Sequence, residues 1–247
     1  DSAGATLASA HGLAIAISAI VMIAFLCGGR AVADQLSASD PVIAGMAFTY
    51  MAITVLALPV QFALGLHADT WRNEGRAGLV ALLSVGVTLA NILLNYVLIG
   101  ELGLGVAGSA WGTALAQVFG LGLLLWLRGR GQGAIPLLAL RRYRWTGGWG
   151  RLAGLGAPLS LSFIGMAVVS ACVIVSLRLT AGADYADTIA AYGIVTRILG
   201  FAYLPSMAFA LALQSIVGNN WGAGLYDRVR SVLHIAMGTA FVYSLGM

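Results

Sequence analysis

The sequence predicts an all-α integral membrane protein, a prediction supported by its composition, its long apolar segments and the placement of its arginines. Of the 247 residues, 60% are apolar and 9% are charged. A soluble domain usually carries about 25% charged residues, so this chain has too few charges to cover a surface in water. The 33 glycines suit helices that pack closely in lipid. A multi-helix bundle in a bilayer is therefore expected.

Seven apolar segments have the length of tilted membrane-spanning helices rather than of the ~10-residue strands of a membrane barrel. They are 6–27, 41–66, 77–99, 106–127, 152–179, 189–218 and 231–247. The last segment is shorter than the ~20 residues that a spanning helix needs. Because the chain also starts with Asp1, we expect it to be part of a longer protein.

The basic residues, which are all arginine, mark one side of the membrane. Ten of them lie in three alternate loops, 67–76, 128–151 and 219–230, whereas the loops between these hold only Arg30. Five of the six tryptophans flank the same three loops. Arginine-rich loops stay in the cytoplasm, and tryptophan collects at the headgroup level. We therefore expect a multi-pass protein of the inner (cytoplasmic) membrane whose partner is the lipid bilayer, and no binding of nucleic acid.

The longest loop, 128–151, separates four apolar segments from three. It contains Pro136 and an arginine cluster at 141–144, which suits a linker that touches anionic lipid. The sequence therefore predicts two lobes, 1–127 and 152–247, joined by a cytoplasmic linker at 128–151.

A glycine-rich run at 103–108 imitates a dinucleotide-binding fingerprint. The run reads Gly-Leu-Gly-Val-Ala-Gly, but it joins two membrane helices, and the fingerprint needs a preceding strand. We interpret the glycines as a tight turn followed by close helix packing. No organic cofactor is expected, and the chain offers no nucleophile–base arrangement that would indicate an enzyme.

Four polar residues lie near this turn, at matched depths on two neighbouring helices. Asn91 and Asn95 share one helix face, as do Thr113 and Gln117, because each pair is four residues apart. Counting residues from the turn pairs Asn95 with Thr113 and Asn91 with Gln117. Such a patch could hold the helices together by hydrogen bonds or could bind an ion or substrate, and composition alone favours neither.

Three stretches carry a resemblance to a known family. They are 91–117 (NILLNYVLIGELGLGVAGSAWGTALAQ), 190–199 (AAYGIVTRIL) and 214–230 (QSIVGNNWGAGLYDRVR). Together, and in this order, they resemble the multidrug and toxic compound extrusion (MATE) family. The resemblance implies a two-lobe, twelve-helix transporter, of which this chain would cover helix three to part of helix nine.

The resemblance further implies antiport, in which a small cationic or amphipathic compound leaves as H⁺ or Na⁺ enters, by a protein that is monomeric when full length. Many prokaryotic members carry Asn-x-x-x-Asp at an amino-terminal-lobe ion site. Asn91 matches the Asn, Asn95 replaces the Asp, and Thr113 matches a further residue of that site. An Asn cannot exchange a proton near neutral pH, but its carbonyl oxygen can ligate Na⁺. A Glu used by another branch is replaced here by Met166.

Arg197 lies inside an apolar segment, where a charged residue is a functional candidate by default. Its alternative is an arginine that reaches outward or pairs with Asp184 or Asp187. Two rival functions stay open: export of lipid-linked saccharides by a member of the same superfamily, and a membrane remnant that transports nothing. The sequence thus predicts an ion or substrate site at Asn91, Asn95, Thr113 and Gln117, with Arg197 as a further member.

Overall fold

The computed structural model describes residues 2–36, 41–180 and 185–246, and they form helices joined by turns and loops, with no strand among them. The prediction of an all-α protein is therefore confirmed. The chain divides into two compact units, Asp1–Ala153 and Gly154–Met247. The predicted lobe boundary at 128–151 lies close to this division, although its role as an inter-lobe linker stays a prediction.

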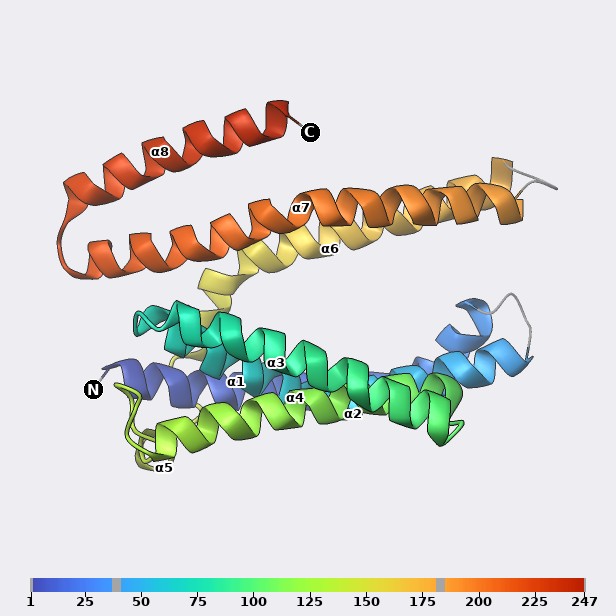
Figure 1. The fold of residues 1–247 in the computed structure, drawn as a ribbon, viewed down its shortest axis with the longest axis horizontal. Coiled ribbons are helices and arrows are strands. Elements are labelled where there is room, and N and C mark those ends of the chain that lie inside the picture. Colours follow the sequence, from blue (N-terminus) through green and yellow to red (C-terminus); the bar gives the residue numbers. More distant parts are fainter. Residues whose placement is uncertain (1, 37–40, 181–184, 247) are drawn as a thin grey trace. The chain divides into compact units, whose positions relative to one another are not determined.

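The first unit is a bundle of long helices that lie side by side (Figure 1). Its helices follow from the apolar segments, because a backbone in lipid must satisfy its hydrogen bonds internally. In chain order they are α1 (Ser2–Leu36), α2 (Pro41–Asn73), α3 (Ala77–Asn95), the π-helical turn η1 (Tyr96–Glu101), α4 (Gly105–Gly129) and the short α5 (Ala139–Arg142).

The core of this unit lies where α2, α3 and α4 meet. Its buried side chains are Ala68, Trp71, Val80, Leu83 and Leu124. Helix α2 packs against α1 and α4, and α3 packs against α4. The turn between α2 and α3 reverses the chain at Gly75, whose φ of +80° favours glycine. The same end of the unit holds α5 and the loop around it, so we call it the arginine-rich end (Figure 1).

The second unit contains most of α6 (Trp149–Thr180), α7 (Tyr185–Gly222) and α8 (Tyr226–Leu245). Helices α7 and α8 run antiparallel (Figure 1). The Tyr243 hydroxyl on α8 donates a 2.7 Å hydrogen bond to the carbonyl of Ala202 on α7.

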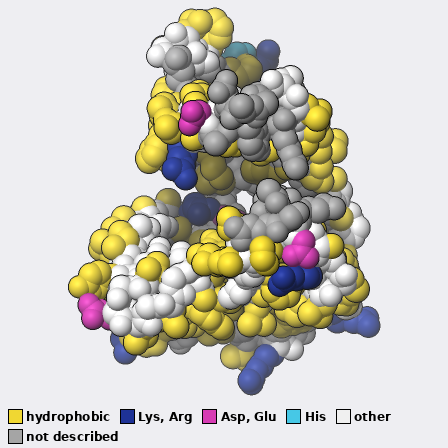
Figure 2. Space-filling model, turned by 90° about the vertical axis from the view of Figure 1, so that its right-hand side faces the viewer, with side chains coloured by type: hydrophobic (Ala, Val, Ile, Leu, Met, Phe, Trp, Pro, Cys, Tyr) yellow, Lys and Arg dark blue, Asp and Glu magenta, His cyan; other side chains and the backbone are white. Residues whose placement is uncertain are grey.

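Six of the described helices are long and apolar enough to cross a membrane: α1, α2, α3 with η1, α4, α6 and α7. They correspond to the first six predicted segments. Helix α8 covers most of the seventh predicted segment. Its first turns contain the charged Asp227, Arg228 and Arg230, and it is not among the helices that are apolar enough to cross a membrane. Figure 2 shows many hydrophobic side chains on the drawn face, with few charged groups between them. Such surfaces suit lipid or further apolar helices, not water.

Candidate functional site

Three of the predicted site residues are joined by hydrogen bonds, one of which links α3 to α4. The Asn91 side-chain amide donates to the Thr113 hydroxyl over 3.2 Å, and the Asn95 amide donates to the Asn91 carbonyl oxygen over 3.3 Å. The Thr113 hydroxyl in turn donates to the Ser109 carbonyl over 3.1 Å. The structure therefore assembles Asn91, Asn95 and Thr113 into one group, which we call the polar patch.

One oxygen of the polar patch is buried without a protein partner. The Asn95 side-chain oxygen, Oδ1, has no hydrogen-bond donor among the described residues. It faces Gly112 of α4, where a Cβ would lie only 2.1 Å from it. A buried acceptor without a donor normally costs free energy, so such a group calls for an explanation. An amide oxygen held in this way can ligate a cation or accept a bond from a substrate.

The pairing across the two helices differs from the one expected from sequence. Asn91 pairs with Thr113, and Asn95 faces Gly112, whereas equal counting from the turn pairs Asn95 with Thr113 and Asn91 with Gln117. The cause is η1, where the Leu102 amide donates to the Val97 carbonyl five residues earlier. A π-helical turn holds more residues per turn than an α-helix, so equal counts do not give equal depth.

The glycine-rich run forms the turn between η1 and α4, as predicted. Gly103 and Gly105 have φ values of +63° and +52°, which L side chains rarely adopt. A Cβ on Gly108 would lie 2.9 Å from the Leu98 carbonyl oxygen, so this glycine lets α4 approach η1 closely. The run is therefore a turn and a packing motif between two helices.

The two remaining predicted residues lie elsewhere. Gln117 is half-buried one turn beyond Thr113 on α4, and Arg197 is exposed on α7 in the second unit. Of its two expected partners, Asp187 is exposed in the first turn of α7, and Asp184 lies outside the described residues. The roles of Gln117 and Arg197 stay predictions.

A second polar cluster, at the arginine-rich end, was not predicted. Arg128, whose side chain is fully buried, donates from Nη1 to the Glu74 carboxylate over 3.0 Å and to the Ile135 carbonyl over 2.7 Å. Glu74 also accepts the backbone N–H groups of Ala134 and Ile135, over 3.0 and 3.4 Å. The Arg128 guanidinium lies 5.0 Å from the Trp71 ring centre. The Arg128–Glu74 ion pair and these hydrogen bonds thus hold the loop after α4 against the α2–α3 turn.

Two histidines extend this cluster. His11 of α1 and His67 of α2 are buried, and their ring centres lie 5.0 Å apart. The His11 Nδ1–H donates to the Leu7 carbonyl over 2.8 Å. Near them, the Trp149 indole donates to the Ser9 carbonyl over 3.1 Å, so the start of α6 is fixed to α1. No local pattern in the sequence indicates that His11 and His67 meet, because they lie on different helices and 56 positions apart.

The described residues contain no group of three or more His, Cys, Asp or Glu side chains that could hold a metal ion. The chemistry available at the polar patch is therefore that of neutral amide and hydroxyl oxygens, which suits weak ligation or hydrogen bonding.

Comparisons with known proteins agree with the resemblance. A family model described as MatE matches residues 158–247. The chain is 26% identical over 195 residues to multidrug and toxin extrusion protein 2 of Mus musculus, a match that covers 77% of this chain and 33% of that protein. It is 28% identical over 198 residues to multidrug and toxin extrusion protein 1 of Homo sapiens, with 77% and 33% covered.

Solved structures share the fold. An outward-facing multidrug resistance MATE family transporter of the MOP superfamily superposes with a TM-score of 0.80 at 20% identity, covering 98% of this chain and 58% of that one. The inward-facing form of such a transporter gives a TM-score of 0.71 at 21% identity, covering 99% and 55%.

The chain is similar to MATE family proteins in sequence and in fold. Its six long apolar helices and the matching transporters make it a multi-pass membrane protein. The chain spans about a third of the length of the curated relatives that it matches. The match of Asn91, Asn95 and Thr113 to the family's ion site stays a prediction.

Proposed function

We propose that this chain is part of a MATE exporter that works by alternating access, and that it contributes the ion or substrate site of the amino-terminal lobe. The exported compound is small and cationic or amphipathic, and the energy comes from entry of H⁺ or Na⁺. The observation that supports the site is the buried Asn95 oxygen, held in the polar patch without a donor among the described residues.

The polar patch favours Na⁺ over H⁺ as the ion bound there. An amide has no proton to exchange near neutral pH, whereas its oxygen carries lone pairs that can ligate a cation. Asn91, Asn95 and Thr113 together supply three such oxygens. Gln117, half-buried one turn away, would supply a further polar group. Arg197 would act elsewhere in the transport cycle.

Export by the intact protein, measured in proteoliposomes at equal protein content, tests this proposal. We expect Asn95→Ala and Thr113→Ala to weaken the Na⁺ dependence roughly tenfold, the factor that corresponds to about 1.4 kcal/mol. Thr88→Ala is the matched control, because the Thr88 hydroxyl also bonds one turn back on its own helix, to Ser84, but is not part of the polar patch. Unchanged efflux and ion dependence in both test variants would refute the site.

A second variant separates the two coupling ions. Asn95→Asp restores the acid that many prokaryotic members carry. We expect this change to add a pH dependence to export, because a carboxyl group can take up and release a proton where the amide cannot. Export that keeps the same pH profile would mean that the patch has no path for protons.

A parallel assay of lipid-linked oligosaccharide flipping distinguishes drug export from the rival saccharide export.

A further inference from the structure

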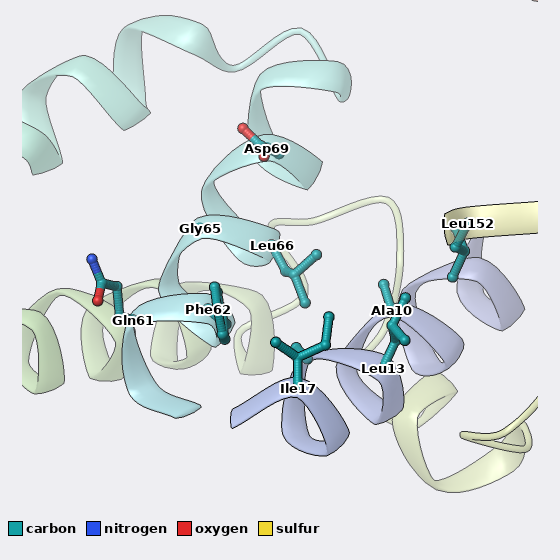
Figure 3. A pocket seen from close by; sticks show the side chains of 10 residues that line it. Ala10, Leu13, Ile17, Gln61, Phe62, Gly65, Leu66, Asp69 and Leu152 are labelled. Atoms are coloured by element: carbon teal, nitrogen blue, oxygen red, sulfur yellow. The ribbon is translucent and has the colours of Figure 1, made fainter. Parts of the chain in front are cut away.

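A groove of about 330 Å³ lies between α1 and α2 near the arginine-rich end of the first unit. Figure 3 shows Leu13 and Ile17 of α1 opposite Phe62 and Leu66 of α2, with Asp69 one turn beyond Leu66. Its walls are largely apolar, and its volume falls within the range of ligand-binding pockets.

Gly65 keeps the groove open. It lies in the wall formed by α2, and a Cβ placed on it would meet no atom within 4 Å. A larger side chain at this position would therefore enter the groove without moving the backbone. The groove thus has free space where Gly65 has no side chain, and a single substitution at Gly65 can fill that space.

Opposite charges lie together at one end of the groove. Asp69 lines the groove and forms an ion pair with Arg72, one turn further along α2. Both side chains are partly exposed, Asp69 to 59% and Arg72 to 29%. Helix α2 ends at Asn73, next to Arg72, so we expect the pair to lie at the level of the lipid headgroups.

We propose that this groove binds a phospholipid with a zwitterionic ethanolamine headgroup. The acyl chain lies in the apolar groove, the ammonium donates to Asp69, and the phosphate accepts from Arg72. A simple organic cation would have to take Asp69 away from Arg72 and leave the guanidinium without its partner. A zwitterion replaces one ion pair by two, so the charge pattern favours the lipid.

Headgroup chemistry predicts a ranking among lipids. The primary ammonium of phosphatidylethanolamine has three N–H donors for Asp69, as a lysine does. The quaternary ammonium of phosphatidylcholine has none, and phosphatidylglycerol has no cation at all. With identical acyl chains, only the ethanolamine lipid pairs both charges and also donates hydrogen bonds to Asp69.

The experiment measures lipid retention on the intact protein by native mass spectrometry, using the three lipids with matched acyl chains. We expect phosphatidylethanolamine to be retained roughly tenfold more than the other two, a factor that one charge-assisted hydrogen bond can supply. Gly65→Leu should abolish this preference, and Asp69→Asn should reduce it. Gly86→Leu is the control, because Gly86 of α3 also has no atom within 4 Å of its Cβ position and lies outside the groove.

Equal retention of the three lipids would overturn the proposal, as would a preference that survives Gly65→Leu. A lipophilic monocation, tetraphenylphosphonium, is tested in parallel. If its binding depends on Gly65 while lipid retention does not, the groove is a site for organic cations and the lipid proposal fails. The measurement does not depend on transport, so its outcome is independent of the proposed export function.

Discussion

The first prediction concerns Gly112, which faces the Asn95 side-chain oxygen of the polar patch. A Cβ on Gly112 would lie 2.1 Å from the Asn95 oxygen, where real contacts are at least 3.0 Å, so Gly112→Ala must displace that oxygen by about 0.9 Å. The Asn95 side chain would leave its rotamer, at about 0.5–1.5 kcal/mol, and lose its bond to Asn91, at about 0.6 kcal/mol. We expect a loss of about 1–2 kcal/mol in unfolding free energy.

The assay is thermal unfolding of the purified protein, where this loss corresponds to a lower Tm by roughly 2–8 °C. Gly122→Ala is the control on the same helix, because no atom lies within 4 Å of its Cβ position. The double variant Gly112→Ala with Asn95→Ala removes the clashing oxygen and should regain stability relative to Gly112→Ala alone. A Tm for Gly112→Ala equal to that of Gly122→Ala, or a double variant that is merely additive, would refute the reasoning.

Three further changes test the packing. Glu74→Ala leaves the buried Arg128 without its carboxylate and should cost about 3–5 kcal/mol in unfolding free energy, measured by thermal unfolding. Gly103→Ala forces a side chain to a φ of +63° and should cost about 1–2 kcal/mol in the same measurement. Tyr243→Phe removes the bond to the Ala202 carbonyl and should cost about 1 kcal/mol, seen as faster proteolysis of the second unit.

Each of these changes has a matched control. For Glu74→Ala it is Glu101→Gln, which alters an exposed acid. For Gly103→Ala it is Gly100→Ala, at a glycine of η1 with open space around it, and for Tyr243→Phe it is Tyr203→Phe, at an exposed tyrosine of α7. The ion-pair argument fails if Glu74→Ala unfolds no earlier than Glu101→Gln. The backbone argument fails if both glycine variants melt together, and the hydroxyl argument fails if both tyrosine variants are cut at the same rate.

The helices could be predicted because lipid imposes simple rules on them. Apolar length and the requirement for internal hydrogen bonding predict where α1, α2 and α4 run, with ends that differ by several residues. The same rules say little about α8, because three charges in its first turns lower its hydropathy. Periodicity alone also placed Asn91 and Asn95 on one face, which the structure confirms.

Contacts between distant segments could not be predicted in this way. Glu74 and Arg128 lie 54 positions apart, and an ion pair depends on where two loops return, which no local pattern encodes. The pairing of Asn91 with Thr113 depends on hydrogen bonding inside η1, and π-helical turns have no strong composition signal. The predicted set therefore contained the three residues of the polar patch together with Gln117 and Arg197, and it did not give the hydrogen-bond partners within the patch.

The π-helical turn Tyr96–Glu101 also determines how the patch would respond to changes in chain length. Successive residues of an α-helix are rotated by about 100° about its axis. Deleting one residue from this segment and restoring regular α-helix would therefore swing the face of Asn91 and Asn95 by about that angle relative to Gly103. The amides would then point away from Thr113. In this hairpin one additional residue determines which way the Asn91 and Asn95 side chains point, so a one-residue deletion that changes no polar side chain would separate the polar patch.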